Sequence, residues 1–183
     1  MIITISGVPG SGKTSVAKIV AERLGLPFYS VGDFRGQMAM DRGMTIDELN
    51  ALGETDKSTD TLADNYQKRL GKNGDDFVIE GRLSWHFIPR SFKVFLDCAL
   101  QESARRVFSS HHERPDEAKR DSIEDVRTEL DARMASDKRR YAAIYGVDYM
   151  DKNHYDLVVD TTSLKSAQET AEKVLAALPP SAS

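Results

Sequence analysis

The chain has 183 residues and a mass of 20.4 kDa, which is enough for one hydrophobic core but short for two independent domains. Hydrophobic residues make up 40% and charged residues 30%, a composition that excludes a disordered or collagen-like chain. The formal net charge of -4 argues against a protein that coats nucleic acid or an anionic membrane, so any anionic ligand has to be bound locally.

The hydrophobic pattern predicts short strands that alternate with helices. A β-branched run at 2–6 ends at Gly7, and apolar residues then recur at helical spacing over 14–24. Further strands are predicted at 27–31, 77–80, 92–96 and 155–160. Strands and helices that alternate in this way predict one α/β domain over 1–183, with a five-stranded parallel sheet covered by helices on both faces.

Two of the gaps between these strands are too long for a single crossover helix, since a strand–helix–strand unit needs about 30 residues in all. We therefore predict two helical insertions. In the first gap, Thr45 and Glu48 form a capping-box pattern, and 56–70 supports another helix. In the second gap, the charged segment 105–140 has only a thin apolar stripe, which predicts a helix packed on one side and mobile against solvent. The last helix is predicted over 163–178, with a frayed tail beyond it.

Cysteine usage and the start of the chain bear on its location. Cys98 is the only cysteine, so no internal disulfide forms and a structural zinc site lacks its ligands. No apolar run approaches the roughly 20 residues that span a bilayer, and Met1 leads directly into a strand without a basic leader segment. We expect a cytoplasmic monomer whose mature chain begins at Met1, with no nucleic-acid or membrane partner.

A phosphate-binding loop follows the first strand. The segment from Gly7 to Thr14 (GVPGSGKT) matches the pattern G-x-x-x-x-G-K-[ST] and lies between a predicted strand and a predicted helix, as that motif requires. Its backbone N–H groups and the following helix N-terminus would hold the phosphates of ATP. Lys13 would reach the β- and γ-phosphates, and the Thr14 hydroxyl would be a ligand of Mg²⁺. The candidate donor-binding residues are Gly7, Gly10, Ser11, Gly12, Lys13 and Thr14. An ordinary glycine-rich turn is the alternative.

An acidic residue is also needed near the magnesium. Glu80 ends the strand predicted at 77–80, and we assign it to the metal, through water. A solvated turn residue is the alternative. The sequence has no N-K-x-D motif for guanine, no L-S-G-G-Q segment, and too little chain for a helicase or motor core. A small phosphotransferase remains.

Several further segments carry a family resemblance that covers nearly the whole chain. They include ITISG with GSGKT, SVGDFR, RGM, EGRL with Trp85, RY-x-x-IYG-x-D, and YDLVVDT. On these residues the chain resembles the nucleoside monophosphate kinases, and most closely the short, archaeal-type cytidylate kinases. The phosphate loop is shared by very many proteins, whereas the EGRL and RY-x-x-IYG-x-D segments are far more specific. The chain departs from the family pattern at Phe28–Tyr29, at Ser84 and at 111–114.

The resemblance implies a P-loop three-layer sandwich with sheet order 2-3-1-4-5. It also implies a nucleotide-acceptor insertion near 33–75 and an arginine-bearing lid near 105–140, where the long gaps lie. In such kinases ATP–Mg²⁺ sits on the loop, and an oxygen of the acceptor phosphate attacks the γ-phosphorus in line, without a covalent protein intermediate. The resemblance also assigns Ser30 and Asp33 to the acceptor.

The acceptor is a dianion, so its site needs fork-shaped cationic donors opposite Lys13. Arg35 and Arg82 both follow predicted strands, at the sheet edge where open α/β folds bind ligands. Asp60 and Asp64, with Gln67, share one helix face, which is either a base-recognition surface or a solvated face.

A second charged helix face is predicted farther along the chain. It carries Arg133, Asp137 and Arg140, whereas Arg139 is turned away from Arg133. We expect the two arginines to move onto the transferring phosphoryl group when the lid closes, with Asp137 orienting them or contacting the ribose. Arg105 and Arg106 are weaker candidates for the same role, and the histidines, including His111 and His112, form no convincing base or ligand set.

The sequence therefore predicts an ATP-dependent kinase of CMP, and of dCMP, with Mg²⁺ as its metal. Two alternatives stay open. One is a kinase of another small acceptor, such as AMP, UMP or a non-nucleotide. The other is a regulatory or RNA-processing module that hydrolyses ATP slowly.

Overall fold

A computed structural model describes residues 1–180 except 54, 57 and 111–121. The strands pair in parallel as one five-stranded sheet in the order β2-β3-β1-β4-β5, which is the predicted order. The strands are β1 (Ile2–Gly7), β2 (Phe28–Ser30), β3 (Phe77–Glu80), β4 (Phe92–Asp97) and β5 (Leu157–Asp160).

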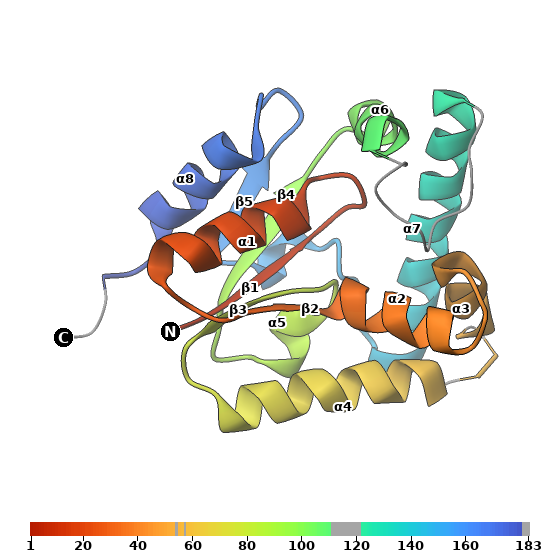
Figure 1. Cartoon of the computed structure of the whole chain (residues 1–183), viewed down its shortest axis with the longest axis horizontal. Coiled ribbons are helices and arrows are strands. Elements are labelled where there is room, and N and C mark those ends of the chain that lie inside the picture. The colour runs from red at the N-terminus through yellow and green to blue at the C-terminus, as the bar shows by residue number, and fades with distance from the viewer. Residues whose placement is uncertain (54, 57, 111–121, 181–183) are drawn as a thin grey trace.

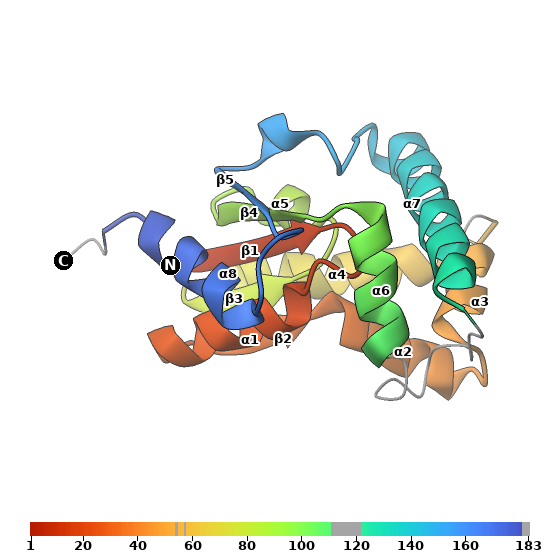
Figure 2. The same cartoon turned by 90° about the horizontal axis from the view of Figure 1, so that it is seen from above.

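Helices cover both faces of the sheet (Figures 1 and 2). Within the described residues they are α1 (Lys13–Leu24), α2 (Val31–Asp41), α3 (Ile46–Leu52), α4 (Ser58–Asn73), α5 (Ser84–Phe87), α6 (Leu100–Ser110), α7 (Ile123–Tyr145), the 3₁₀ helix η2 (Lys152–His154) and α8 (Ala167–Ala177). Among these helices, none combines the length and the apolar character needed to cross a membrane.

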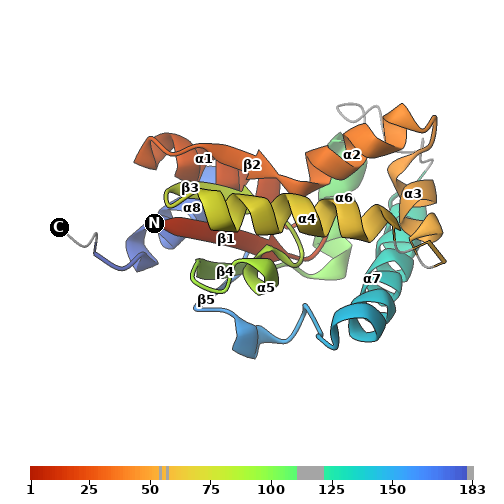
Figure 3. The same ribbon diagram turned by 90° about the horizontal axis from the view of Figure 1, so that it is seen from below.

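The alternation of side chains along β1 separates two cores. Ile3 and Ile5 pack with α1 and α8 on one face of the sheet, in a cluster that includes Val16, Val20 and Val174. On the other face, Ile2 packs with β3, α4 and the segment after α5, through residues such as Phe77, Ala63 and Ile88. Figure 3 shows α4 running along this second face. Both faces are therefore covered, as β-branched strands of a parallel sheet require.

Helices α2, α3, α6 and α7 gather beyond the carboxyl ends of the strands (Figures 1 and 3). The predicted strand at 27–31 ends at Ser30, because the Ser30 hydroxyl accepts a hydrogen bond from the Asp33 N–H and starts α2 at Val31. Helix α2 is not predicted by the apolar pattern. The capping box of Thr45 and Glu48 is confirmed at the start of α3.

The predicted charged helical segment at 105–140 corresponds to two helices, α6 and α7. Residues 111–114, with His111 and His112, lie outside the described residues. The thin apolar stripe packs against α6, since Val126 and Leu130 cluster with Ala104 and Phe108. Farther along α7, Asp137, Arg140 and Tyr141 are also buried. Helix α7 is therefore held along most of its length.

Leu130 gives a test of the packing between α6 and α7. Its side chain is buried, so Leu130→Ala should lower the free energy of unfolding by about 3 kcal/mol. Thr128→Ala, at an exposed position of the same helix, is the control and should change it by less than about 0.5 kcal/mol. Urea unfolding followed by circular dichroism measures both. A loss below about 1 kcal/mol for Leu130→Ala would contradict this packing.

Candidate functional site

The loop between β1 and α1 has the backbone of a phosphate-binding loop. Gly7, Gly10 and Gly12 have φ values of 148°, 73° and 85°, in the region that favours glycine. A Cβ atom on Gly7 would lie 2.2 Å from the Leu96 carbonyl oxygen, so this position has no space for a side chain. Gly12 occupies the N-cap position of α1 and offers no side chain to the first N–H groups of the helix. These groups can therefore bind an anion.

Lys13 lies at the start of α1 and folds back over the loop. Its Nζ donates a hydrogen bond of 2.7 Å to the Val8 carbonyl oxygen, which also accepts the Ser11 hydroxyl at 2.8 Å. The Lys13 ammonium is thus held beside the loop that the phosphates would occupy. Thr14 follows in the first turn of α1 and is partly buried.

A cavity of about 540 Å³ adjoins this loop. Its walls come from the loop and α1, from α6, and from the segment after β5. Arg106 of α6 spans part of it and donates to the Thr161 carbonyl oxygen at 2.7 Å and to Glu102 Oε1 at 2.8 Å. Hydrogen bonds from Arg105 and Arg106 lower the pKa of Glu102 to about 2. The sequence analysis did not assign the segment after β5 to the site. Its position at the carboxyl end of a parallel strand, where open α/β sheets bind ligands, could have indicated it.

Glu80 lies at the end of β3, between Ile5 of β1 and Ser30 of β2. Its side chain is buried, and its Oε1 accepts a hydrogen bond from the Ser30 hydroxyl. Ser30 therefore both caps α2 and orients Glu80. The neighbouring Asp33 is exposed in the first turn of α2.

Three arginines and two aspartates from four segments form one connected network. Asp137 of α7 contacts two of the arginines: its Oδ2 lies 2.6 Å from Arg82 Nε, and its Oδ1 accepts from Arg140 Nη2 at 2.8 Å. Asp60 of α4 contacts two as well: its Oδ1 accepts from Arg35 Nη1 at 2.9 Å, and its Oδ2 lies 3.4 Å from Arg140 Nε. We call these five residues the charge network. The structure thus joins Arg35 and Arg82, both predicted for the acceptor, to the predicted α7 face.

The charge network is shielded from water. The side chains of Asp60, Asp137 and Arg140 are 6%, 3% and 3% exposed, and that of Arg82 is 18% exposed. Burial by itself lowers the pKa of Arg82, but the Asp137 carboxylate, together with Tyr149 and Tyr141, outweighs burial and raises it above the usual value. Counted by formal charge, the three guanidinium groups exceed the two carboxylates by one. Such a site suits an anion.

Other predicted residues lie around this network with different partners. Asp64 accepts a hydrogen bond of 2.8 Å from the Tyr145 hydroxyl, and burial raises the pKa of its carboxyl group. Gln67 is buried and accepts from the Ser84 hydroxyl at 2.8 Å, so its side chain holds α4 to α5. Arg133 is partly buried on α7, whereas Arg139 is exposed and turned away, as the helical spacing predicts.

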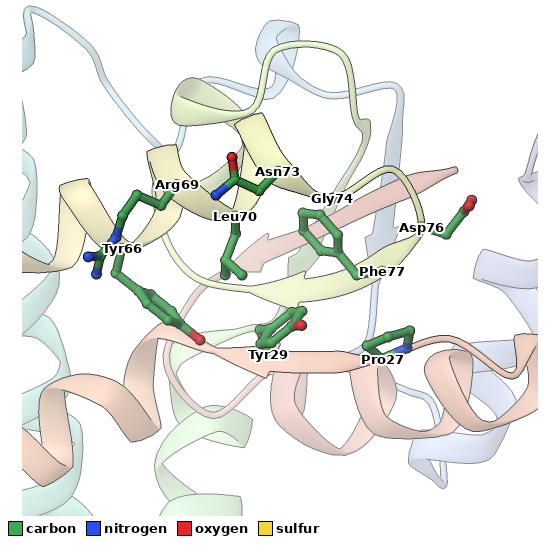
Figure 4. Close-up of a pocket in the computed structure, with 9 residues that line it drawn as sticks. All are labelled: Pro27, Tyr29, Tyr66, Arg69, Leu70, Asn73, Gly74, Asp76 and Phe77. Atoms are coloured by element: carbon green, nitrogen blue, oxygen red, sulfur yellow. The ribbon is translucent and has the colours of Figure 1, made fainter.

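A second cavity, of about 520 Å³, is lined by residues of β2, α4 and the start of β3 (Figure 4). It runs between β2 and α4, and the rings of Tyr29, Tyr66 and Phe77 contribute to its lining. Its lining includes Asp76 and Phe77, at the start of β3 rather than at its carboxyl end. It contains none of the residues of the loop or the charge network, so it is not part of the candidate site.

Comparisons with known proteins place the chain among nucleotide kinases. Residues 2–163 match the sequence model of the cytidylate kinase-like family. A cytidylate kinase of Methanothermobacter thermautotrophicus is 40% identical over 88% of this chain and 95% of its own length. One from Archaeoglobus fulgidus is 37% identical over 97% of this chain and 94% of its own length.

Solved structures share the fold at low identity. The shikimate kinase of Acinetobacter baumannii, in complex with shikimate, superposes with a TM-score of 0.60 at 16% identity, over 95% of this chain and 90% of that one. An uncharacterized protein from Eubacterium ventriosum gives a TM-score of 0.69 at 17% identity, over 96% of each chain. At these identities the likeness concerns the fold alone.

Asp137 gives a test of the charge network. Asp137→Ala leaves Arg82 and Arg140 without their shared buried carboxylate and should lower the free energy of unfolding by about 3 kcal/mol. Asp131→Ala, at an exposed position of the same helix, is the matched control and should have an effect below about 0.5 kcal/mol. Chemical unfolding of both variants measures the difference. Equal stabilities would show that Asp137 does not hold these arginines.

Proposed function

The chain belongs to the cytidylate kinase-like family, and we propose that it transfers the γ-phosphoryl group of ATP to CMP, giving ADP and CDP. The observation that carries this proposal is the match to this family over residues 2–163, on a chain whose phosphate loop and charge network share the carboxyl end of one parallel sheet. A cytoplasmic location, a monomeric state and the use of dCMP stay predictions.

The donor binds on the phosphate loop in this proposal. The N-terminal N–H groups of α1 and the Lys13 ammonium hold the phosphates of ATP, and Lys13 exchanges the Val8 carbonyl for phosphate oxygens. The cavity beside α6 is open to the loop residues Ser11 and Gly12, so it can take the nucleoside part of ATP. Arg106 lies along this cavity and not in the charge network, which makes it a donor-side residue.

Thr14 and Glu80 are the residues that would hold Mg²⁺. The ion commonly keeps several waters and takes one or two protein oxygens together with phosphate oxygens. The Thr14 hydroxyl and the Glu80 carboxylate fit this need, since both are oxygen donors at the same end of neighbouring elements and Ser30 fixes the orientation of Glu80. When bound, the ion neutralises charge on the transferring phosphoryl group.

The acceptor binds on the side of the charge network. Arg35 and Arg82 carry guanidinium groups, whose planar fork of N–H donors suits a phosphate dianion, and the formal surplus of positive charge in the network favours it. Ser30, Asp33, Asp60 and Asp64 remain our candidates around the acceptor, although Ser30, Asp60 and Asp64 already have partners within the protein.

The reaction itself needs positioning and charge, not a protein nucleophile. An acceptor phosphate oxygen attacks the γ-phosphorus as the bond to the ADP oxygen breaks. Arg133 and Arg140 of α7 would stabilise the charge that spreads over the transferring group. Arg140 is tied to Asp60 and Asp137, so it has to exchange at least one of these partners to reach that group. Asp137 acts as a positioning residue for the arginines.

An assay with different acceptors tests the proposed function. ADP formation should depend strictly on an added nucleoside monophosphate and should be fastest with CMP, when CMP, dCMP, UMP, AMP and GMP are compared in a coupled assay. Preference for another monophosphate would indicate a kinase of a different acceptor, such as AMP or UMP. ADP formation that needs no acceptor would instead indicate a slow ATPase and would overturn the kinase proposal.

Lys13→Ala tests the donor site. Loss of a preorganised cation at the transferring phosphate should lower kcat by about 100-fold or more. The Lys13 side chain is partly exposed and bonds a loop carbonyl, so the melting temperature should change little. Steady-state kinetics and a thermal melt measure the two effects, with Lys18→Ala, at an exposed position of the same helix, as the control. Retention of more than about a tenth of wild-type turnover is incompatible with the proposed role.

A further inference from the structure

Asn50 of α3 contacts two arginines of the charge network through two different atoms. Its side-chain Oδ1 accepts a hydrogen bond of 3.0 Å from Arg35 Nη2. Its backbone carbonyl oxygen accepts one of 2.9 Å from Arg140 Nη1. Asn50 is therefore a junction between the arginine of α2 and the arginine of α7. The sequence motifs did not single it out.

The side-chain contact fixes the direction of the Arg35 guanidinium. A guanidinium group has five N–H donors, and Arg35 uses two of them on Asp60 and Asn50. The contacts hold both terminal nitrogens, yet the remaining donors can still bind an external oxygen anion. The side chain of Arg35 is 11% exposed, so contacts within the protein hold it and only a limited part of it is open to an arriving anion. A held guanidinium loses less conformational entropy when a phosphate arrives.

The backbone contact fixes Arg140 on the end of α3. The carbonyl groups of the last turn of a helix lack intrahelical partners, and a cation there also interacts favourably with the helix dipole. The Arg140 guanidinium lies close to the backbone at the end of α3: a Cβ atom on Gly53 would lie 3.0 Å from Arg140 Nη1. Replacing the Asn50 side chain leaves this backbone carbonyl in place. The two contacts can therefore be separated by mutation.

We propose that Asn50 is a positioning residue for the acceptor: its side-chain amide orients Arg35 toward the phosphate of the bound monophosphate. This inference rests on the proposed function and adds a residue of α3 to it. An amide suits this position because its oxygen accepts from the guanidinium without adding a negative charge beside a dianion.

Asn50→Ala should weaken the binding of CMP and leave the binding of ATP unchanged. We expect the Kd and the KM for CMP to rise about 10-fold, the size of one lost hydrogen bond to a charged group. The affinity for ATP and kcat should stay within about twofold, since Arg140 keeps its backbone partner. A purely structural defect would lower the melting temperature and kcat without this split between KM and kcat.

The experiment combines calorimetric titration of CMP with a double-mutant cycle. Wild type, Asn50→Ala, Arg35→Ala and the double variant are titrated, and Asn65→Ala, an exposed asparagine of α4, serves as the matched control. If Asn50 acts through Arg35, Asn50→Ala weakens CMP binding in the wild-type background and has no further effect in the Arg35→Ala background.

The outcomes separate this inference from the proposed function. CMP affinity within twofold of wild type in Asn50→Ala would overturn the role of Asn50 alone, as would additive effects in the cycle. No binding of CMP by the wild-type protein would overturn the proposed function, and with it the inference. A 10-fold loss that disappears in the Arg35→Ala background supports both.

Discussion

The arrangement of the site depends on how three arginines are held close together in a shielded place. Guanidinium groups repel one another, and the protein balances them with two carboxylates that each contact two arginines. The chain of contacts runs from Arg35 to Asp60, Arg140, Asp137 and Arg82. Since these residues come from α2, α4, α7 and the segment after β3, the same contacts that prepare an anion site also join four parts of the fold.

This arrangement changes the expected behaviour of α7. The sequence predicted a helix with one thin apolar stripe, mobile against solvent. In the structure, the stripe packs on α6, and the far end of the helix is joined to α4 by Tyr145 and to the segment after β3 by Asp137. Buried polar contacts of this kind are costly to leave unpaired. If α7 closes over the site and keeps these contacts, the motion has to occur outside 137–145. If the motion breaks them, the substrate phosphates have to replace the lost partners.

The sequence predicted the sheet well because strand and loop signals are local. The β-branched run of β1, the glycines of the phosphate loop and the Thr45 capping box each specify structure within a few residues. Helix α2 escaped prediction because its pattern of apolar residues is weak and its start depends on the Ser30 cap. Most of the residues brought together at the site were predicted, but their pairing was not. Asp60 and Asp64 share a helix face, yet one contacts arginines and the other contacts Tyr145, which only tertiary packing decides.

The charge of the network also explains why Asn50, which contacts two of its arginines, is a neutral residue. Three arginines and two aspartates carry a formal surplus of one positive charge, which favours a phosphate dianion without any lysine among these five residues. A third carboxylate would cancel that charge and repel the acceptor. An apolar residue would leave the Arg35 Nη2 donor without its partner in a place that is largely shielded from water. An amide satisfies the donor and preserves the surplus charge, so the chemistry of Asn50 follows from the same electrostatic constraint that fixes the two aspartates.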